Sequence, residues 1–450
     1  MSAAAGSRDK HLYMVQEGTY GTMEESGYSE PGIVRKAVFG NPDLQLVEEE
    51  GLGVAGTSSI VKGPHKAVAS MELAITADNM WAAMICAALG NGAATASGTA
   101  SQLEDSQPGY DVVQHRKVGT EYVVNAMGGA KISKLTLGVD YEAPRITLAT
   151  DLMGLYTLQS INSSLSTALS LSGFYGDTDL SGCKPSPLTR TPLTPEIAKL
   201  YYASGTAGDP TAVGSKAFDI SYTGADGKVA ELVISAAKAE IYLDGVLDTS
   251  IGSSGILDFT KTTSPAMHTF ENLCTEIETG DYSCDNIYTD TSPWPALLIP
   301  QRTVIPASES SVDIHYLPIL SASSVHGTEH GGGFQISVDR APEAKAGPYT
   351  GGDSSVYHIA HASMDPTAYN AVVEATTHEV TTGFADGYND QDDYYLAAVI
   401  RDSPIFIMTV GPCKIMEAPA SSSEPGLTTQ SIKWKNYGGE HTVGAYVVPA

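Results

Sequence analysis

The sequence predicts a mainly β protein in which a β-sandwich or barrel is flanked by a short helix. In residues 135–139 (Leu-Thr-Leu-Gly-Val) and 146–148 (Ile-Thr-Leu), apolar side chains recur at every second position. This alternation is typical of strands with one face buried and the other in water. A single short helix cannot cover the core of a chain of 450 residues, so the strands must supply most of that core.

The short helix is predicted over residues 77–90. Asp78 or Thr76 can cap its start, and Gly90 can end it. The apolar side of this helix consists of Met80, Trp81, Met84 and Ile85. We therefore expect these side chains to form a core helix beneath the strands.

Residues 1–35 predict an extended arm, because polar residues and repeated glycines oppose a helix there. Tyr13, Tyr20 and Tyr28 can anchor this arm on a neighbouring subunit, since tyrosine gives a large contact area at low entropic cost. A floppy terminus without such an anchor is the alternative interpretation.

The pattern along the chain predicts three parts. Residues 1–157 form a β-sandwich with the arm, a long loop and the helix. Residues 158–300 begin with Ser, Thr, Gly and Pro and continue with hairpin-like strands, which predicts a linker and an inserted β-rich region. Residues 301–450 repeat the order strands, helix, strands, with a helix expected at 366–379. This echo suggests an old duplication, although no residue-level repeat survives.

The composition excludes some partners. The formal net charge is −27, from 52 acidic and 25 basic residues. Such a surface repels nucleic acid and anionic membranes, because binding them needs Lys and Arg. Only 17% of residues are charged, against roughly 25% in average globular proteins, which suits a chain that buries much of its surface against copies of itself. A turn-rich β protein or salt adaptation would give a similar composition.

The five cysteines are scattered and form no C-x-x-C pair, which predicts neither a zinc site nor a dense disulfide framework. The first ten residues contain no apolar segment, and no run approaches the roughly 18 apolar residues of a membrane helix. We expect a chain made in the cytosol, without a membrane partner.

No motif predicts catalysis, a metal ion or a cofactor. Residues 330–333 (His-Gly-Gly-Gly) match the oxyanion motif of esterases, but no G-x-S-x-G elbow accompanies them, so we expect a bulge or turn. His326 and His330 have metal-ligand spacing that works only on a helix, which the adjacent glycines oppose. The carboxylates of residues 386–393 lack the order of an EF-hand and predict a solvated acidic turn. The chain is therefore expected not to be an enzyme.

Three segments resemble the major tail tube proteins of long-tailed, siphovirus-like bacteriophages or related tailed viruses. Residues 13–22 (Tyr-Met-Val-Gln-Glu-Gly-Thr-Tyr-Gly-Thr) resemble the opening of those proteins. Residues 73–90, with Leu-Ala-Ile-Thr followed by Met-Trp-Ala-Ala-Met, resemble their strand and helix. Residues 129–137 resemble the strand before the outer edge of that fold. The resemblance covers the first third of the chain and is weaker in the last third.

The resemblance implies a structural virion protein in the viral tail. Its copies would join edge to edge into rings that stack as a hollow tube, contacting other tail proteins and delivering viral DNA without binding it specifically. A true duplication would give trimeric, pseudo-sixfold rings, and otherwise the rings would be hexameric. A channel lined with carboxylates would give the DNA nothing to grip. The acidic loop, with Glu48, Glu49, Glu50 and Leu52, is expected to reach the adjacent ring.

Other classes of protein stay open at this point. A capsid, decoration or minor tail protein would also be β-rich and self-associating. A surface adhesin-type β-sandwich would need an export signal, which the sequence does not display. A hydrolase or metalloenzyme would need the motifs that were not found.

Overall fold

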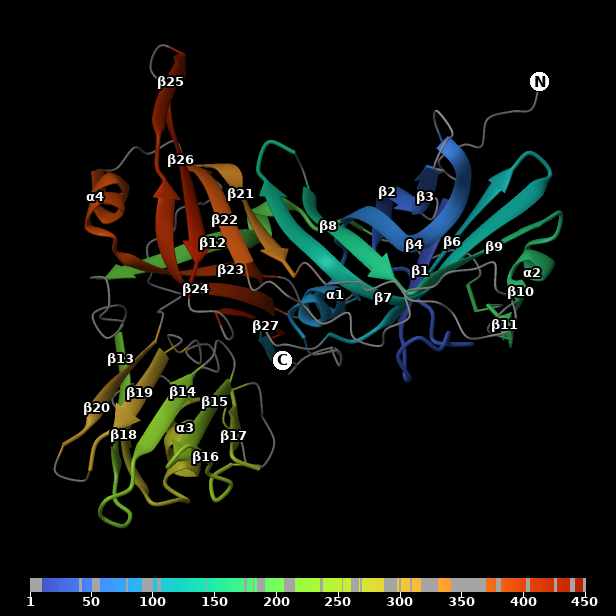
Figure 1. Ribbon diagram of the computed structural model, residues 1–450. Helices are drawn as coiled ribbons and strands as arrows, with labels where there is room; N and C mark the ends of the chain where they lie inside the picture. Colours follow the sequence, from blue (N-terminus) through green and yellow to red (C-terminus); the bar gives the residue numbers. More distant parts are fainter. Residues whose placement is uncertain are drawn as a thin grey trace.

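Eight antiparallel strands form the central part of a larger continuous sheet in the computed structural model of the chain (Figure 1). The sheet runs in the order β2 (Ile33–Phe39), β4 (Thr57–Ala74), β8 (Arg145–Gly154), β7 (Glu121–Asp140), β21 (Gly331–Asp339), β22 (Asn370–Thr377), β26 (Leu427–Asn436) and β24 (Ile405–Glu417). The predicted mainly β fold is confirmed.

The structure describes the following residues: 10–39, 43–50, 57–77, 80–90, 100–102, 107–143, 145–173, 176–180, 182–183, 191–205, 215–234, 238–252, 254–259, 267, 269–286, 298, 301–307, 310–316, 331–340, 370–377, 382–401, 405–424, 427–437 and 442–447.

The eight-stranded sheet consists of two halves with the same connectivity. In chain order the first half contributes β2, β4, β7 and β8, and the second half contributes β21, β22, β24 and β26. A helix follows the second strand of each half: α1 (Met80–Leu89) and α4 (Thr382–Asp390). A further strand, β6 (Tyr110–Val118) or β23 (Asp393–Arg401), then pairs with the third strand of its half. The topology therefore repeats where the sequence shows only a faint echo.

The third strand of each half bends and serves two layers. The first part of β7 pairs with β6 and β9 (Tyr156–Asn162), and its last part pairs with β8 and β21. Likewise, the first part of β24 pairs with β23 and β27 (Val443–Val447), and its last part pairs with β26. By connectivity, β27 in the second half corresponds to β9 in the first.

The helix predicted at 77–90 is confirmed as α1, which lies under the sheet. Trp81, Met84 and Ile85 are buried, whereas the side chain of Met80 lies outside the described residues. The Trp81 Nε1–H donates to the Thr76 carbonyl over 2.7 Å, and the Trp81 ring meets Phe406 edge-on at 4.9 Å. A helix that is apolar all round must be enclosed, and here both halves enclose it.

The prediction of a helix at 366–379 is wrong, because residues 370–377 form strand β22. Their burial alternates, with Ala371, Val373 and Ala375 inside. Strand β22 lies between β21 and β26 and pairs with both, which satisfies its backbone hydrogen-bonding groups. The amino-acid pattern alone does not reveal this pairing. The helix of this half is α4, so part of the expected acidic turn at 386–393 is helical.

The glycine run at 331–333 forms a bulge, as predicted, where the register of β21 against β22 shifts. Gly333 has φ +132°, and a Cβ there would lie 2.3 Å from the Val139 carbonyl oxygen. Only glycine fits this close approach of β21 to β7.

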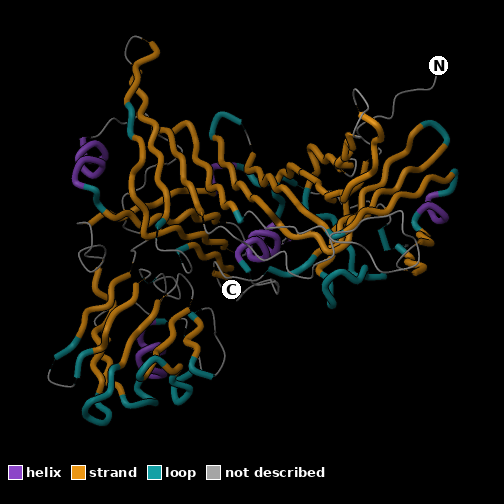
Figure 2. The backbone as a smooth tube through the Cα atoms, viewed as in Figure 1, coloured by secondary structure: helices purple, strands orange, loops and turns teal. Residues whose placement is uncertain are grey.

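Residues 215–316 build a second body with its own core. One sheet joins β18 (Tyr282–Asn286), β13 (Ser215–Tyr222) and β20 (Val312–Tyr316). The other joins β16 (Val246–Leu247), β15 (Lys238–Leu243), β14 (Ala230–Ile234) and β19 (Gln301–Ile305), with β17 (Ile256–Asp258) also on β15. The helix α3 (Phe270–Ile277) packs into this core, as Figure 2 shows by its place among the strands.

This inserted body differs in extent from the predicted 158–300 region. Ile305 and Ile314, placed by prediction in the last part, belong to the inserted core. Conversely, β12 (Ala198–Gly205) pairs with β23 of the main sheet. The short 3-10 turn Pro195–Ile197 leads into β12.

The N-terminal arm forms a smaller layer on the first half. Strand β1 (Lys10–Gln16) pairs with β6. The short elements α2 (Leu165–Ala168), β10 (Ser170–Gly173) and β11 (Gly176–Asp179) follow β9 nearby. Three further strands extend the main sheet: β3 (Asp43–Glu50) pairs with β4, β5 (Ala100–Gln102) with β27, and β25 (Ala420–Glu424) with β26.

Candidate assembly interface

The two ends of the eight-stranded sheet are unpaired in the described part of the chain. Among the described residues, strand β2 pairs with β4 alone. At the other end, residues 414–417 of β24 pair with β26 alone. Such edges present free backbone N–H and C=O groups in the geometry that another strand needs. They are therefore the candidate functional site of this chain.

The junction between the two halves shows such an edge when it is paired with another strand. Residues 134–139 of β7 pair with residues 334–339 of β21 over six register positions. On the core side Leu137 and Ile336 are fully buried. On the outer side the hydroxyls of Thr136 and Ser337 hydrogen-bond over 3.0 Å. This junction combines a dry apolar layer with a polar outer layer.

Strand β2 has no such partner strand on its other side among the described residues. Its core-facing Ala37 and Phe39 are only half-buried against the main core. Val38 leaves 46% of its surface exposed. Arg35 is held by its own chain, with its Nη1 3.1 Å from Oε1 of Glu72. The strand thus has apolar area to bury at its free side.

The free end of β24 has a similar unsatisfied surface. Met416 is 49% exposed, and the Tyr388 side chain of α4 is also exposed. Between α4 and this edge lies a groove of about 460 Å³, lined by Ala385, Tyr388, Asn389 and residues 416–419. A strand that continued the sheet beyond β24 would lie beside this groove.

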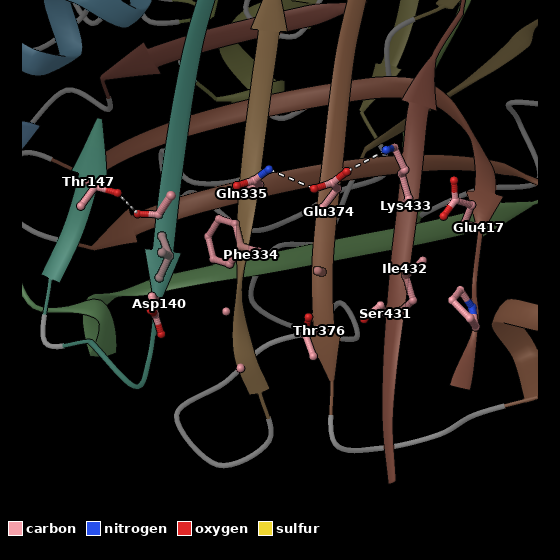
Figure 3. A pocket seen from close by; sticks show the side chains of 16 residues that line it. Asp140, Thr147, Phe334, Gln335, Glu374, Thr376, Glu417, Ser431, Ile432 and Lys433 are labelled. Atoms are coloured by element: carbon pink, nitrogen blue, oxygen red, sulfur yellow. Dashed lines mark hydrogen bonds and ion pairs between the residues drawn. The ribbon is translucent and has the colours of Figure 1, made fainter. Parts of the chain in front are cut away.

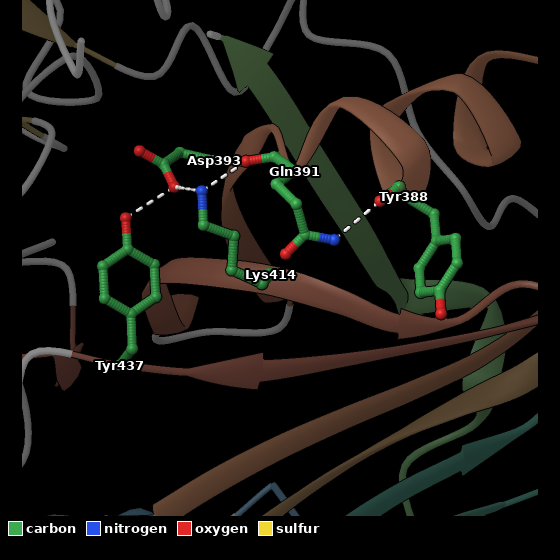
Figure 4. A network of polar contacts seen from close by, with 5 residues as sticks. All are labelled: Tyr388, Gln391, Asp393, Lys414 and Tyr437. Atoms are coloured by element: carbon green, nitrogen blue, oxygen red, sulfur yellow. Dashed lines mark hydrogen bonds and ion pairs between the residues drawn. The ribbon is translucent and has the colours of Figure 1, made fainter. Parts of the chain in front are cut away.

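A polar network fixes the C-terminal end of α4 beside this edge (Figure 4). The Lys414 Nζ lies 2.6 Å from Oδ1 of the buried Asp393, and the Tyr437 hydroxyl donates to the same oxygen over 2.5 Å. Lys414 also donates to the carbonyl of Gln391, whose side chain donates to the Tyr388 carbonyl over 2.7 Å. Burial, and then the hydrogen bond to Asp393, raises the pKa of Tyr437, so its hydroxyl stays a donor. The edge is therefore held in a fixed position.

The outer face of the sheet is balanced in charge. Register places on one face the acidic residues Glu72, Asp140, Asp151, Asp339, Glu374 and Glu417 and the basic residues Lys36, Lys134, Arg145, Lys414, Lys433 and Lys435. The acidic residues named here do not outnumber the basic ones, and Arg35 pairs with Glu72 beside them, whereas the whole chain has 52 acidic and 25 basic residues. The net acidity of the chain is therefore not repeated on this face, and a channel lined with carboxylates stays a prediction.

Glu374 shows how the charges on this face are satisfied (Figure 3). Its Oε1 lies 2.8 Å from the Nζ of Lys433, and its Oε2 accepts from Nε2 of Gln335 over 2.9 Å. The hydrogen bond to Glu374 raises the pKa of Lys433, so this lysine stays charged and paired. A shallow groove of about 480 Å³ surrounds the pair and is floored by small residues such as Gly138 and Gly333.

The three arm tyrosines contact the chain's own sheet. Tyr13 is buried in β1 and stacks on His115 with ring centroids 5.5 Å apart. The Lys131 ammonium lies 4.7 Å from the ring centroid of Tyr20, and the Tyr28 hydroxyl donates to Oδ2 of Asp111 on β6 over 3.5 Å. The role of the arm in joining subunits stays a prediction.

A buried pair of carboxyl groups, which the sequence analysis missed, attaches the arm to the sheet. Oε1 of Glu17 accepts from the Gly129 amide over 2.5 Å, and Oδ2 of Asp111 accepts from the Glu24 amide over 2.6 Å. Burial of the Asp111 side chain, and then its hydrogen bond to Glu17, raises the pKa of Asp111 to about 9, so Asp111 keeps its proton near neutral pH. Single acidic residues in strand-like runs give no sequence signal for such a pair.

A histidine pair lies farther along the same seam. His11 and His115 are direct partners in the β1–β6 ladder, with ring centroids 5.0 Å apart. Burial lowers the pKa of His115 to about 4, and the neighbouring His11 contributes to this shift. The arm strand is thus attached through groups that respond to pH in opposite directions.

The proposed inter-ring residues lie partly in a strand. Glu48, Glu49 and Glu50 belong to β3, where Glu48 pairs with Ile60, rather than to a loop. Their side chains and Leu52 lie outside the described residues. Their contact with an adjacent ring stays a prediction.

Within the described ranges, no group of three His, Cys, Asp or Glu side chains could hold a metal ion. His326 and His330 lie outside these ranges. None of the described helices has both the length and the apolar character needed to cross a membrane.

Comparison with known proteins gives little further information. No protein-family model matches the chain, and no curated protein matches it. Among solved structures, a chain from the "Virion of native gene transfer agent (GTA) particle" is similar over 27% of this chain and 88% of its own length. The identity is 13% and the TM-score is 0.20.

Proposed function

We propose that this chain is a structural virion protein that assembles edge to edge into rings of a tail tube. The observation that carries the proposal is the pair of free edges on a sheet whose halves already join edge to edge. The β7–β21 junction within the chain is the template for a junction between β24 of one copy and β2 of the next. The resemblance of residues 13–22, 73–90 and 129–137 to tail tube proteins supports the same assignment.

The number of strands is compatible with a closed ring. Eight alternating strands leave β2 and β24 running in opposite directions, so β2 of a second copy continues the antiparallel order. Because the two edges differ, the contact is head-to-tail, and such contacts form rings when the rotation closes. Each chain supplies two halves, so three chains would supply the six units of a pseudo-sixfold ring.

The internal repeat also points to a second contact between copies. In the first half, α1 is covered by the second half, including β27 and Phe406. The corresponding helix α4 has an exposed outer side with Tyr388. Since β27 corresponds to β9, the surface that would cover α4 is β9 of the next copy, where Ile161 is 55% exposed. Burying these two side chains together would add an apolar contact behind the strand junction.

The charge pattern fits a channel for DNA without specific binding. On the outer sheet face, lysines such as Lys433 are paired with carboxylates of the same chain. Binding of phosphates depends on free cations that release counterions, and paired lysines are poor at this.

The experiment is to concentrate the purified chain and examine it by negative-stain electron microscopy and analytical ultracentrifugation. We expect rings of three copies with an axial hole, stacking into tubes. Rings that fail to stack would favour a minor tail protein. A chain that stays monomeric at high concentration under low- and high-salt conditions would refute the assembly function.

A further inference from the structure

Two of the five cysteines lie side by side in the inserted body. Cys274 is on α3 and Cys284 is on β18, and their sulfur atoms are 2.8 Å apart. Their residues are 4% and 5% exposed, respectively. The remaining cysteines, Cys86, Cys183 and Cys413, belong to the cores of the main sheet and the arm layer.

Local structure fixes the position of both thiols. Thr269 caps α3, its Oγ1 accepting from the Asn272 amide over 3.2 Å, and Cys274 lies on the buried side of this helix. On β18, Cys284 pairs with Ile220 in the sheet, and its amide donates to Oε1 of Glu278 over 3.3 Å. Both side chains are thus held toward each other by ordinary helix and sheet contacts.

We propose that Cys274 and Cys284 are an oxidation site and form a reversible disulfide that staples α3 to β18. The oxidant is a small-molecule disulfide. The thiolate of one cysteine attacks a sulfur of the oxidant, forming a mixed disulfide and releasing one small thiol. The second cysteine, as thiolate, attacks the mixed disulfide and releases the second small thiol. Two protein thiols are oxidised and one small disulfide is reduced to two thiols.

Burial controls how fast this exchange proceeds. Burial raises the pKa of Cys284, and the hydrogen bond to Cys274 raises it further. Little reactive thiolate of Cys284 therefore exists in the folded protein. Oxidation therefore proceeds through openings that separate α3 from β18, and it accelerates in mild denaturant. Once formed, the bond shortens the loops available to the unfolded chain and raises the unfolding temperature of the inserted body.

The test uses the full-length chain and glutathione disulfide as the oxidant, in buffer and in mild urea. After removal of the oxidant, thiols are titrated in denaturant and non-reduced peptides are mapped by mass spectrometry. We expect the five thiols of the reduced chain to fall by two, with Cys274 and Cys284 in one cross-linked peptide pair. A reductant should restore all the thiols and lower the unfolding temperature again.

Matched variants separate this site from general oxidation. Cys274→Ser and Cys284→Ser should each abolish the cross-link, whereas Cys183→Ser should retain it. Persistence of all five thiols in mild urea would overturn the proposal. So would a cross-link through another cysteine, or a stable glutathione adduct on only one of the two. None of these outcomes depends on whether the chain assembles into rings.

Discussion

The substitution Val38→Asp tests the proposed junction at an exposed apolar position of β2. Val38 lies on the free strand β2, with 46% of its surface in water. Val304→Asp is the matched control, because Val304 is a strand valine with 58% of its surface exposed on β19 of the inserted body. Both substitutions add one carboxylate, but only the first adds it at an edge of the eight-stranded sheet.

The expected size of the effect follows from burial. Complete burial of a valine side chain is worth about 1.5–3 kcal/mol, so the half that Val38 exposes contributes about 0.7–1.4 kcal/mol to a junction. Leaving a new polar group without a partner in that junction costs roughly another 1–3 kcal/mol. The sum of about 2–4 kcal/mol corresponds to roughly 30- to 1,000-fold weaker association, since about 1.4 kcal/mol is a factor of ten. The isolated chain should change by no more than about 0.5 kcal/mol.

Sedimentation velocity across a concentration series measures this effect, and urea unfolding of the monomer checks its stability. We expect Val38→Asp to shift the assembly threshold upward by at least tenfold, and Val304→Asp to leave it in place. Equal thresholds for Val38→Asp and the unmodified chain would refute the role of β2 as an assembly edge. Equal losses in both variants would point to net charge rather than to the junction.

Three further outcomes concern the arm and the bulge. The pKa of Asp111 is about 9 in the folded chain, above its ordinary value of 3.8, so the free energy of unfolding should fall as pH rises from 3.8 to 9. Asp111→Asn should reduce this pH dependence in urea unfolding. The pKa of His115 is about 4 in the folded chain, below its ordinary value of 6.5, so stability should fall as pH drops from 6.5 to 4. His115→Phe should remove this loss of stability in thermal unfolding. Gly333→Ala should cost at least about 1–3 kcal/mol in urea unfolding, because its Cβ would meet a backbone oxygen, whereas Gly332→Ala, with 3.5 Å of clearance, should cost less.

The sequence predicts best the parts of the fold that carry a clear local signal. The alternation at 135–139 indicates a strand, and the cap candidates and terminal glycine around the apolar run at 77–90 indicate a helix. Both predictions are confirmed. The run at 370–377 is short and apolar, so helix and strand are equally compatible until β21 and β26 flank it. Tertiary pairing decided that segment, and no local pattern reports tertiary pairing.

The candidate interface was harder to predict for a related reason. An edge strand and a central strand have similar sequences. Only the register shows that β2 and residues 414–417 have no second neighbouring strand among the described residues. The balance of charge on the outer face is also invisible in a composition with 27 excess negative charges, because it depends on which side of each strand a residue occupies.

The charges at the two edges argue for head-to-tail contact rather than pairing of like edges. Arg35 and Lys414 are engaged by carboxylates of their own chain, Glu72 and Asp393. The exposed charge on the outer face of β2 is then that of Lys36, and Glu417 is exposed at the β24 edge. Two β2 edges would bring like charges together, whereas β2 against β24 brings opposite charges together. Edge charges also oppose sheet extension by other chains, so in the proposed assembly the same residues would disfavour wrong partners and favour the next copy.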